Sequence, residues 1–150
     1  MKLLKHVFFI ILLSLSVATF SLTQAEEVDK PQIIVVHLSN FTGDLHAALM
    51  AIKFANTLQA KGAQVTLFLD MEAVRAADYR QPQNLKWGMV GSSFAEQYNV
   101  FVKTDGQVIL CPHCAMAAGI TEKYLRNGAK MGTVESITDL LFAADKVIDY

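Results

Sequence analysis

Two cysteines, Cys111 and Cys114, are the residues of this sequence whose type and spacing point most clearly to chemistry. They are the only cysteines of the chain, and they stand one helical turn apart in a Cys-Pro-His-Cys motif directly after the apolar run Val108–Leu110. A cysteine thiolate is both a nucleophile and a ligand for soft metals. The pair is therefore suited to thiol–disulfide exchange, to carrying sulfur, or to binding a metal ion.

The residues around the pair favour a reactive thiolate at Cys111. If Cys111 ends a strand and Pro112 takes the first helical position, free backbone N–H groups point at the sulfur, and the missing N–H of the proline costs nothing. The start of a helix carries partial positive charge, which favours thiolate over thiol. His113, when protonated, adds to this effect. We expect Cys111 to act as the nucleophile, Cys114 to resolve whatever Cys111 acquires, and His113 to tune Cys111.

Two other readings of the motif remain open. Cys111 and Cys114, with or without His113, suit soft Cu(I) or Zn(II) if a neighbouring subunit supplies further ligands. Alternatively, the cysteines form only a local disulfide in an oligomeric interaction protein, although so short a loop removes little unfolded-state entropy. Two cysteines exclude a disulfide framework and a four-cysteine zinc site within one chain. No cofactor and no single-chain metal site are expected.

The first 25 residues have the pattern of an export signal. Lys2 and Lys5 give a positive start, Val7–Val17 is an apolar core too short to span a bilayer with confidence, and small residues follow at the expected cleavage site. Export predicts a periplasmic or secreted protein. In such an oxidising compartment an exposed cysteine pair tends to be a disulfide unless a reductant reaches it.

Cleavage of the signal would leave residues 26–150, which is the size of one domain. Removing Lys2 and Lys5 changes the formal net charge from −1 to −3, and no basic run remains. This charge balance argues against nucleic acid and against an anionic membrane surface as partners. We expect no membrane association once the signal is removed.

Short apolar or β-branched segments alternate with helical patterns along the rest of the chain. Strands are expected near residues 33–36, 65–69, 107–110, 129–131 and 146–149, and helical segments near 45–59, 72–77, 92–103, 112–118, 121–126 and 133–144. This alternation predicts an α/β domain with a doubly wound, mainly parallel five-stranded sheet and helices on both faces.

Three polar segments follow strands and are therefore expected at one edge of that sheet. They are His37–Asp44, Asp70–Glu72 and Cys111–Cys114, and together they are expected to face one shallow site. His37 is interpreted as a packed, hydrogen-bonded imidazole. The carboxylates in these segments are interpreted as helix caps or solvated charges, and Asn40 or Thr42 is expected to cap the first helix.

The motif itself resembles the active site of periplasmic thiol oxidants of the DsbA type. The thioredoxin fold of those proteins carries a cis-proline loop well downstream of the cysteines, and no proline follows Pro112 in this chain. We therefore reject the thioredoxin fold and keep its chemistry as an analogy.

Several short stretches together match another family. They are Ile-Val-Val-His-Leu before a long Ala/Leu-rich helix, Gly62–Val65 before the second strand, Cys111 after the third, Ala118–Thr121, Asn127–Lys130, and a final Leu-Leu-x-x-Ala-Asp-Lys-Val-Ile. In this order the chain resembles the DsrE/DsrF-like (TusD/YchN-type) family of sulfur-relay proteins over about residues 32–149. Export and the extra Cys114 depart from the pattern of the cytoplasmic members.

The resemblance implies a doubly wound domain that assembles into dimers, trimers or hexamers. It also implies that the cysteine after the third strand, here Cys111, carries a persulfide received from or passed to a sulfur donor or acceptor protein or a small sulfur compound. The resulting hypothesis is an exported sulfur-transfer or thiol-exchange protein with a persulfide on Cys111 that Cys114 resolves. Whether it turns over as a sulfurtransferase is left open.

Overall fold

The computed structural model describes residues 30–88 and 91–150. The expected export signal, residues 1–25, lies outside the described residues, and so do residues 26–29 and 89–90. Among the residues described, no helix combines the length and the apolar character that crossing a membrane requires.

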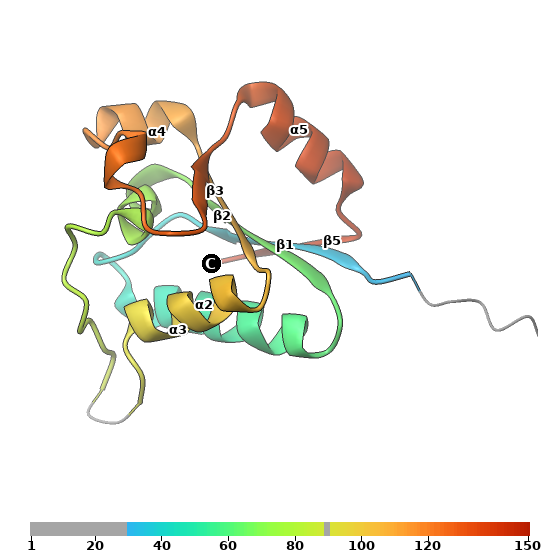
Figure 1. Ribbon diagram of the computed structural model, residues 1–150, viewed down its shortest axis with the longest axis horizontal. Helices are drawn as coiled ribbons and strands as arrows, with labels where there is room; N and C mark the ends of the chain where they lie inside the picture. The colour runs from blue at the N-terminus through green and yellow to red at the C-terminus, as the bar shows by residue number, and fades with distance from the viewer. Residues whose placement is uncertain (1–29, 89–90) are drawn as a thin grey trace, which may run out of the picture. The chain divides into compact units, whose positions relative to one another are not determined.

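A five-stranded sheet runs through the domain. Its strands are β1 (Ile33–Leu38), β2 (Gln64–Leu69), β3 (Gln107–Leu110), β4 (Ala129–Met131) and β5 (Lys146–Asp149), and their order is β4-β3-β2-β1-β5 (Figure 1). Each pair of neighbouring strands is parallel. The expected α/β fold with a mainly parallel sheet is confirmed. The chain adds strands on one side of β1 and then returns with β5 to the other side.

Helices cover both faces of this sheet, as the sequence predicted. Helices α2 (Leu45–Ala60) and α3 (Phe94–Lys103) lie on one face, and α4 (Pro112–Ala117) and α5 (Val134–Ala143) lie on the other (Figure 1). Two segments that were expected to be ordinary helical turns are 3₁₀ helices instead, η1 (Met71–Ala77) and η2 (Glu122–Tyr124).

The main hydrophobic core lies between the sheet and the α2/α3 layer. Alternate residues of the central strands face the small side chains of α2 and the aromatic side chains of α3, because successive side chains of a strand point to opposite faces. The buried members are Val36, Leu38, Val65, Leu67, Leu69, Val108 and Leu110 from the strands and Ala48, Ala51, Ile52, Ala55, Phe94, Tyr98 and Phe101 from the helices. Burying each of the larger side chains stabilises the fold by roughly 1.5–3 kcal/mol.

The predicted capping of the first helix by Asn40 or Thr42 is wrong, whereas the interpretation of Asp44 as a helix cap is confirmed. Asp44, rather than Asn40 or Thr42, is the N-cap of α2, and its Oδ1 accepts a hydrogen bond of 2.9 Å from the backbone N–H of Ala47. The hydroxyl of Thr42 instead donates to Oε1 of Glu72 at 2.8 Å. A carboxylate from η1, distant in the sequence, thus takes the Thr42 hydroxyl away from the helix start.

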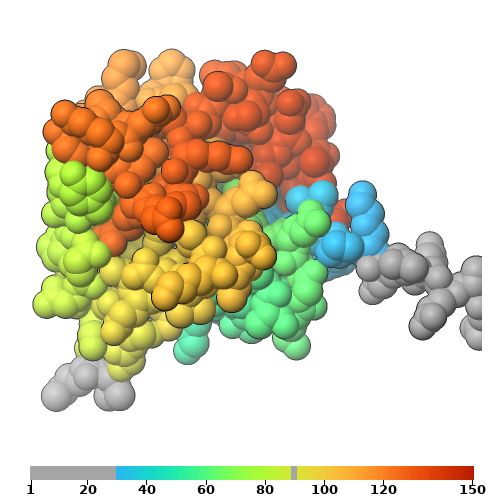
Figure 2. Space-filling model, viewed as in Figure 1, coloured from blue at the N-terminus to red at the C-terminus, as the bar shows by residue number. Residues whose placement is uncertain are grey.

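The opposite face of the sheet is covered thinly. No residue of α5 is buried, and Phe142 on this helix is 88% exposed. Val134, Leu141 and the edge-strand residue Val147 are exposed as well. Helix α5, red in Figure 2, therefore presents apolar side chains on the surface of the molecule.

Candidate functional site

Cys111 stands where β3 ends and α4 begins, as the sequence predicted. Its backbone N–H donates to the carbonyl oxygen of Leu69 at 2.8 Å, which extends the sheet beyond β3. Its own carbonyl accepts from the N–H of Ala115 at 3.0 Å, and Pro112 occupies the first helical position. The side chain of Cys111 is partly exposed at the carboxyl edge of the sheet. Since α4 has only six residues, its contribution to the charge at Cys111 is that of a short helix.

Cys114 lies next to Cys111 and is also partly exposed, with no disulfide between them in the structure. Burial raises the pKa of the Cys114 thiol, and so do its hydrogen bond to Cys111 and the negative charges of Cys111 and Asp70. The backbone N–H of Met71 opposes this by donating to the sulfur of Cys114. Cys114 therefore holds its proton more tightly than an ordinary thiol does.

Met71 reaches Cys114 through an uncommon backbone conformation. Its φ angle is +45°, in the left-handed region that side chains other than glycine rarely occupy. The residue begins η1 directly after Asp70 at the end of β2. This turn packs the start of η1, directly after β2, against α4. It also directs the backbone N–H of Met71 to the sulfur of Cys114.

His113, between the two cysteines, is exposed. Within residues 30–88 and 91–150, its ring makes no hydrogen bond or ion pair, and no group of three or more His, Cys, Asp or Glu side chains is arranged to hold a metal ion. A metal on Cys111 and Cys114 would thus need ligands from outside this part of the chain.

His37 lies between two carboxylates at the same edge. Its Nδ1 is 2.7 Å from Oδ1 of Asp149, its partner residue on β5, and its Nε2 is 3.1 Å from Oδ1 of Asp70. The ring also stacks on Phe68, with 5.2 Å between ring centroids. Neither His37 Nε2 nor Asp70 Oδ1 has a hydrogen-bond partner among the described residues, so this close approach lacks the alignment of a hydrogen bond. The packed imidazole predicted from the sequence is found here.

The structure brings some of the expected edge segments together and separates others. Asp70 lies 3.1 Å from the ring of His37, and its charge raises the pKa of Cys114. Glu72 turns toward the loop after β1, where it accepts hydrogen bonds from the backbone N–H of Phe41 and from Thr42. Asp44 caps α2 and takes no part in the cysteine site.

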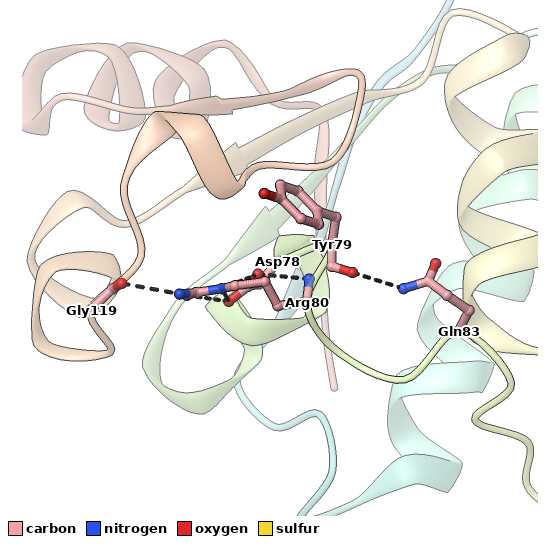
Figure 3. Close-up of polar contacts among 5 residues, drawn as sticks. All are labelled: Asp78, Tyr79, Arg80, Gln83 and Gly119. Carbon is pink, nitrogen blue, oxygen red and sulfur yellow. Dashed lines mark hydrogen bonds and ion pairs between the residues drawn. The ribbon is translucent and has the colours of Figure 1, made fainter.

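A polar network that sequence reasoning missed anchors the segment after α4. Asp78 is 1% exposed, and its carboxylate accepts hydrogen bonds from Nε and Nη2 of Arg80 at 2.9 and 2.6 Å, while Nη2 also donates to the carbonyl of Gly119 at 3.4 Å (Figure 3). Burial acts to raise the pKa of Asp78, but the hydrogen bonds and charge of Arg80 and the charge of Arg126 lower it below the ordinary value. The network joins η1 to the end of α4.

Arg126, which follows η2, makes a second set of hydrogen bonds to η1 and to the loop after it. It is buried, and its Nε donates to the carbonyl of Ala76 at 2.9 Å while Nη1 donates to Gln83 at 2.6 Å. Burial lowers the pKa of the Arg126 guanidinium, against the opposing effect of Tyr98 and Asp78. Arg126 thus joins η1 to the chain after η2, and the Asp78 network joins the end of η1 to the end of α4.

Comparisons with known proteins place this geometry in a family. The DsrE/DsrF-like family matches residues 32–150, whereas no curated protein matches the chain. The crystal structure of the YchN protein from E. coli is similar, with 22% identity, a TM-score of 0.64, and 80% of this chain and 99% of that chain covered. MTH1491 from Methanobacterium thermoautotrophicum, described as a protein of unknown function, has 14% identity, a TM-score of 0.62, and coverages of 78% and 97%. Both likenesses show the fold, and the match over residues 32–150 shows that the chain belongs to the DsrE/DsrF-like family, whose members generally work in sulfur relay with partner proteins.

Proposed function

We propose that this chain is an exported sulfur carrier that holds sulfane sulfur as a persulfide on Cys111 and releases it with the help of Cys114. The observation that carries the proposal is the position of the pair. Two free thiols lie one turn apart at the carboxyl edge of a parallel sheet, and the second is hydrogen-bonded to the first. Membership of a sulfur-relay family supports the same chemistry.

Loading is a thiol exchange at sulfur. The Cys111 thiolate attacks the outer sulfur of a donor persulfide, the S–S bond of the donor breaks, and the donor leaves as its thiolate. Cys111 then carries the persulfide. Burial and its contact with Cys111 raise the pKa of Cys114, so Cys114 keeps its proton during loading.

Release has two routes. An acceptor thiolate can take the outer sulfur from Cys111, which restores the thiol and requires no change of oxidation state in the protein. Alternatively, Cys114 as thiolate attacks the inner sulfur of the persulfide, and sulfide leaves with the electron pair of the broken S–S bond. The sulfane sulfur is then reduced to sulfide while the two cysteines are oxidised to a disulfide.

The proposal includes the cellular setting inferred from the sequence. The export pattern of residues 1–25 supports a periplasmic or secreted location. The exposed apolar side chains of α5 support assembly of several copies, because isolated soluble domains rarely expose such groups together. His113, exposed beside Cys111, is proposed to tune the thiolate rather than to contact the sulfur donor.

Sulfide release tests whether Cys111 carries the sulfur and Cys114 resolves the persulfide. Reduced protein treated with one equivalent of a small persulfide should release sulfide and form an intramolecular disulfide. Cys114→Ser should accept sulfur but release no sulfide without an added thiol, and Cys111→Ser should do neither. Sulfide release from Cys111→Ser at the wild-type rate would contradict the assignment of Cys111 as the carrier.

A further inference from the structure

An open hollow of about 380 Å³ adjoins the cysteine pair, between η1 and α4. It is lined by Met71, Glu72, Arg75, Cys114, Ala117 and Ala118. We propose that this hollow binds a small oxyanion that carries sulfane sulfur, of which thiosulfate is the simplest, with Arg75 as its cationic contact. The inference rests on the proposed function and names the class of donor that loads the pair.

The guanidinium of Arg75 is free to meet an anion in the hollow, because the one carboxylate of the lining is engaged elsewhere. The carboxylate of Glu72 is engaged by the loop after β1, where both the backbone N–H of Phe41 and the Thr42 hydroxyl donate to it. Within the described ranges, Arg75 has no carboxylate within 4.0 Å and its side chain makes no hydrogen bond. A guanidinium in this position can offer several N–H donors to the oxygens of an oxyanion.

A second carboxylate, that of Asp70, lies outside the hollow. The carboxylate of Asp70 acts on Cys114 from the other side, and its Oδ1 lies 3.1 Å from the ring of His37. Asp70 is not among the residues that line the hollow. Arg75 is the one cationic side chain among the hollow's lining residues. Glu72 lines the hollow as well, but no described carboxylate lies within the 4.0 Å of Arg75 that an ion pair requires.

The remaining lining suits a sulfur atom. Met71, Ala117 and Ala118 present apolar atoms beside the thiol of Cys114. Sulfur is polarisable and packs favourably on apolar surfaces, whereas sulfonate oxygens require hydrogen-bond donors. Thiosulfate combines both ends in one small molecule, so its oxygens can meet Arg75 while its outer sulfur lies against Cys114, next to Cys111.

The transfer balances without a further reactant. Of the two cysteines, Cys114 lines the hollow and Cys111 is hydrogen-bonded to it from just outside. The thiolate of Cys111 attacks the outer sulfur of thiosulfate. The S–S bond of thiosulfate breaks, sulfite leaves with the electron pair of that bond, and Cys111 becomes a persulfide. No proton or external electron is needed for this step.

Comparing two sulfur donors tests the oxyanion site separately from the carrier function. Thiosulfate carries an oxyanion, whereas cysteamine persulfide has no net charge at neutral pH and offers sulfane sulfur without one. Reduced full-length protein is treated with each donor, and the rate of persulfide formation is measured by mass spectrometry, together with sulfite release for thiosulfate. Arg75→Gln should slow loading from thiosulfate by about 10-fold or more, as expected for the loss of one charge-assisted contact, and change loading from cysteamine persulfide by less than about threefold.

Control variants make the result specific. Arg75→Lys should retain much of the thiosulfate rate, and Lys61→Gln, which removes an exposed cation at the opposite edge of the sheet, should change neither rate. Loading from cysteamine persulfide but not from thiosulfate would overturn the inference and leave the carrier proposal standing. An equal loss with both donors in Arg75→Gln, or no loss with either, would also overturn it. Failure of both donors to load wild-type protein would remove the proposed function itself.

Discussion

The Nε2 atom of His37 lies 3.1 Å from Oδ1 of Asp70, so that the ends of β1 and β2 are linked at the edge where the cysteines stand. The next residue, Met71, then donates its backbone N–H to the sulfur of Cys114. The environment of the second cysteine is thus set by residues that precede it by about forty positions in the sequence. This arrangement leads to predictions about Cys114 that do not depend on the sulfur donor.

The Asp70 charge should affect the titration of Cys114. In a Cys111→Ala background, Asp70→Asn removes a negative charge that disfavours the thiolate, so the pKa of Cys114 should fall. Alkylation by iodoacetamide, measured against pH, should then reach its half-maximal rate at a lower pH than in Cys111→Ala alone. Asp139→Asn, which removes an exposed carboxylate on α5, is the matched control and should leave the curve in place. A curve that moves to higher pH in Asp70→Asn would contradict the charge argument.

The left-handed backbone at Met71 should cost stability. Since the Met71 side chain is 66% exposed and φ is +45°, Met71→Gly should raise the free energy of unfolding by about 0.5–1 kcal/mol through relief of strain. Met116, 73% exposed within α4, provides the comparison, because Met116→Gly should lower the same quantity by about 1 kcal/mol. Urea unfolding measures both variants. Similar losses in the two variants would show that Met71 is not strained.

The Asp78 network should affect how the free energy of unfolding depends on pH under acidic conditions. Because the pKa of Asp78 is lowered in the folded state, the unfolded chain binds the proton more readily, and stability falls as the pH drops below the ordinary aspartate value of about 3.9. Above that pH, Asp78→Asn should lower the melting temperature by several degrees, since Arg80 loses its charged partner. The difference from wild type should shrink below about pH 4. A difference that stays constant from pH 7 to pH 3 would exclude a role for the charge.

Assembly through α5 should depend on its exposed apolar side. Phe142→Asp places a charge on a side chain that is 88% exposed, so it should leave the isolated fold within about 0.5 kcal/mol of wild type while disrupting contacts between copies. Light scattering should then report a smaller particle than for wild type. Val100→Asp, on the exposed side of α3, should not change the particle size. A wild-type protein that is already monomeric at high concentration would refute the proposed assembly.

Local sequence patterns were sufficient for much of the fold and for the position of the cysteines. The β-branched run from Ile33 predicted β1, although the strand extends to Leu38. The apolar run before Cys111 and the proline after it predicted the junction of β3 and α4, since both signals lie within a few residues of one another. Such features are decided by neighbouring residues, so they can be recognised without the tertiary structure.

The contacts that complete the site depend on strand order and on distant groups. His37 meets Asp149 because β5 pairs with β1 in that register, and no local pattern fixes that strand order. Thr42 was expected as a cap but bonds to Glu72, thirty residues away. The positive φ of Met71 has no signal in a residue type that usually avoids it. These contacts follow from the assembled fold rather than from composition.

The central claim is that sulfur is carried on Cys111, and peptide mass spectrometry of the Cys114→Ser variant tests it most directly. In this variant a persulfide cannot be resolved within the chain, so it should accumulate after exposure of the reduced, folded protein to a sulfane-sulfur donor. The account predicts a peptide containing Cys111 that is heavier by one sulfur atom, and that loses this mass on treatment with a reducing thiol. A Cys111 that remains an unmodified thiol in this variant, with each donor tried, would contradict the account.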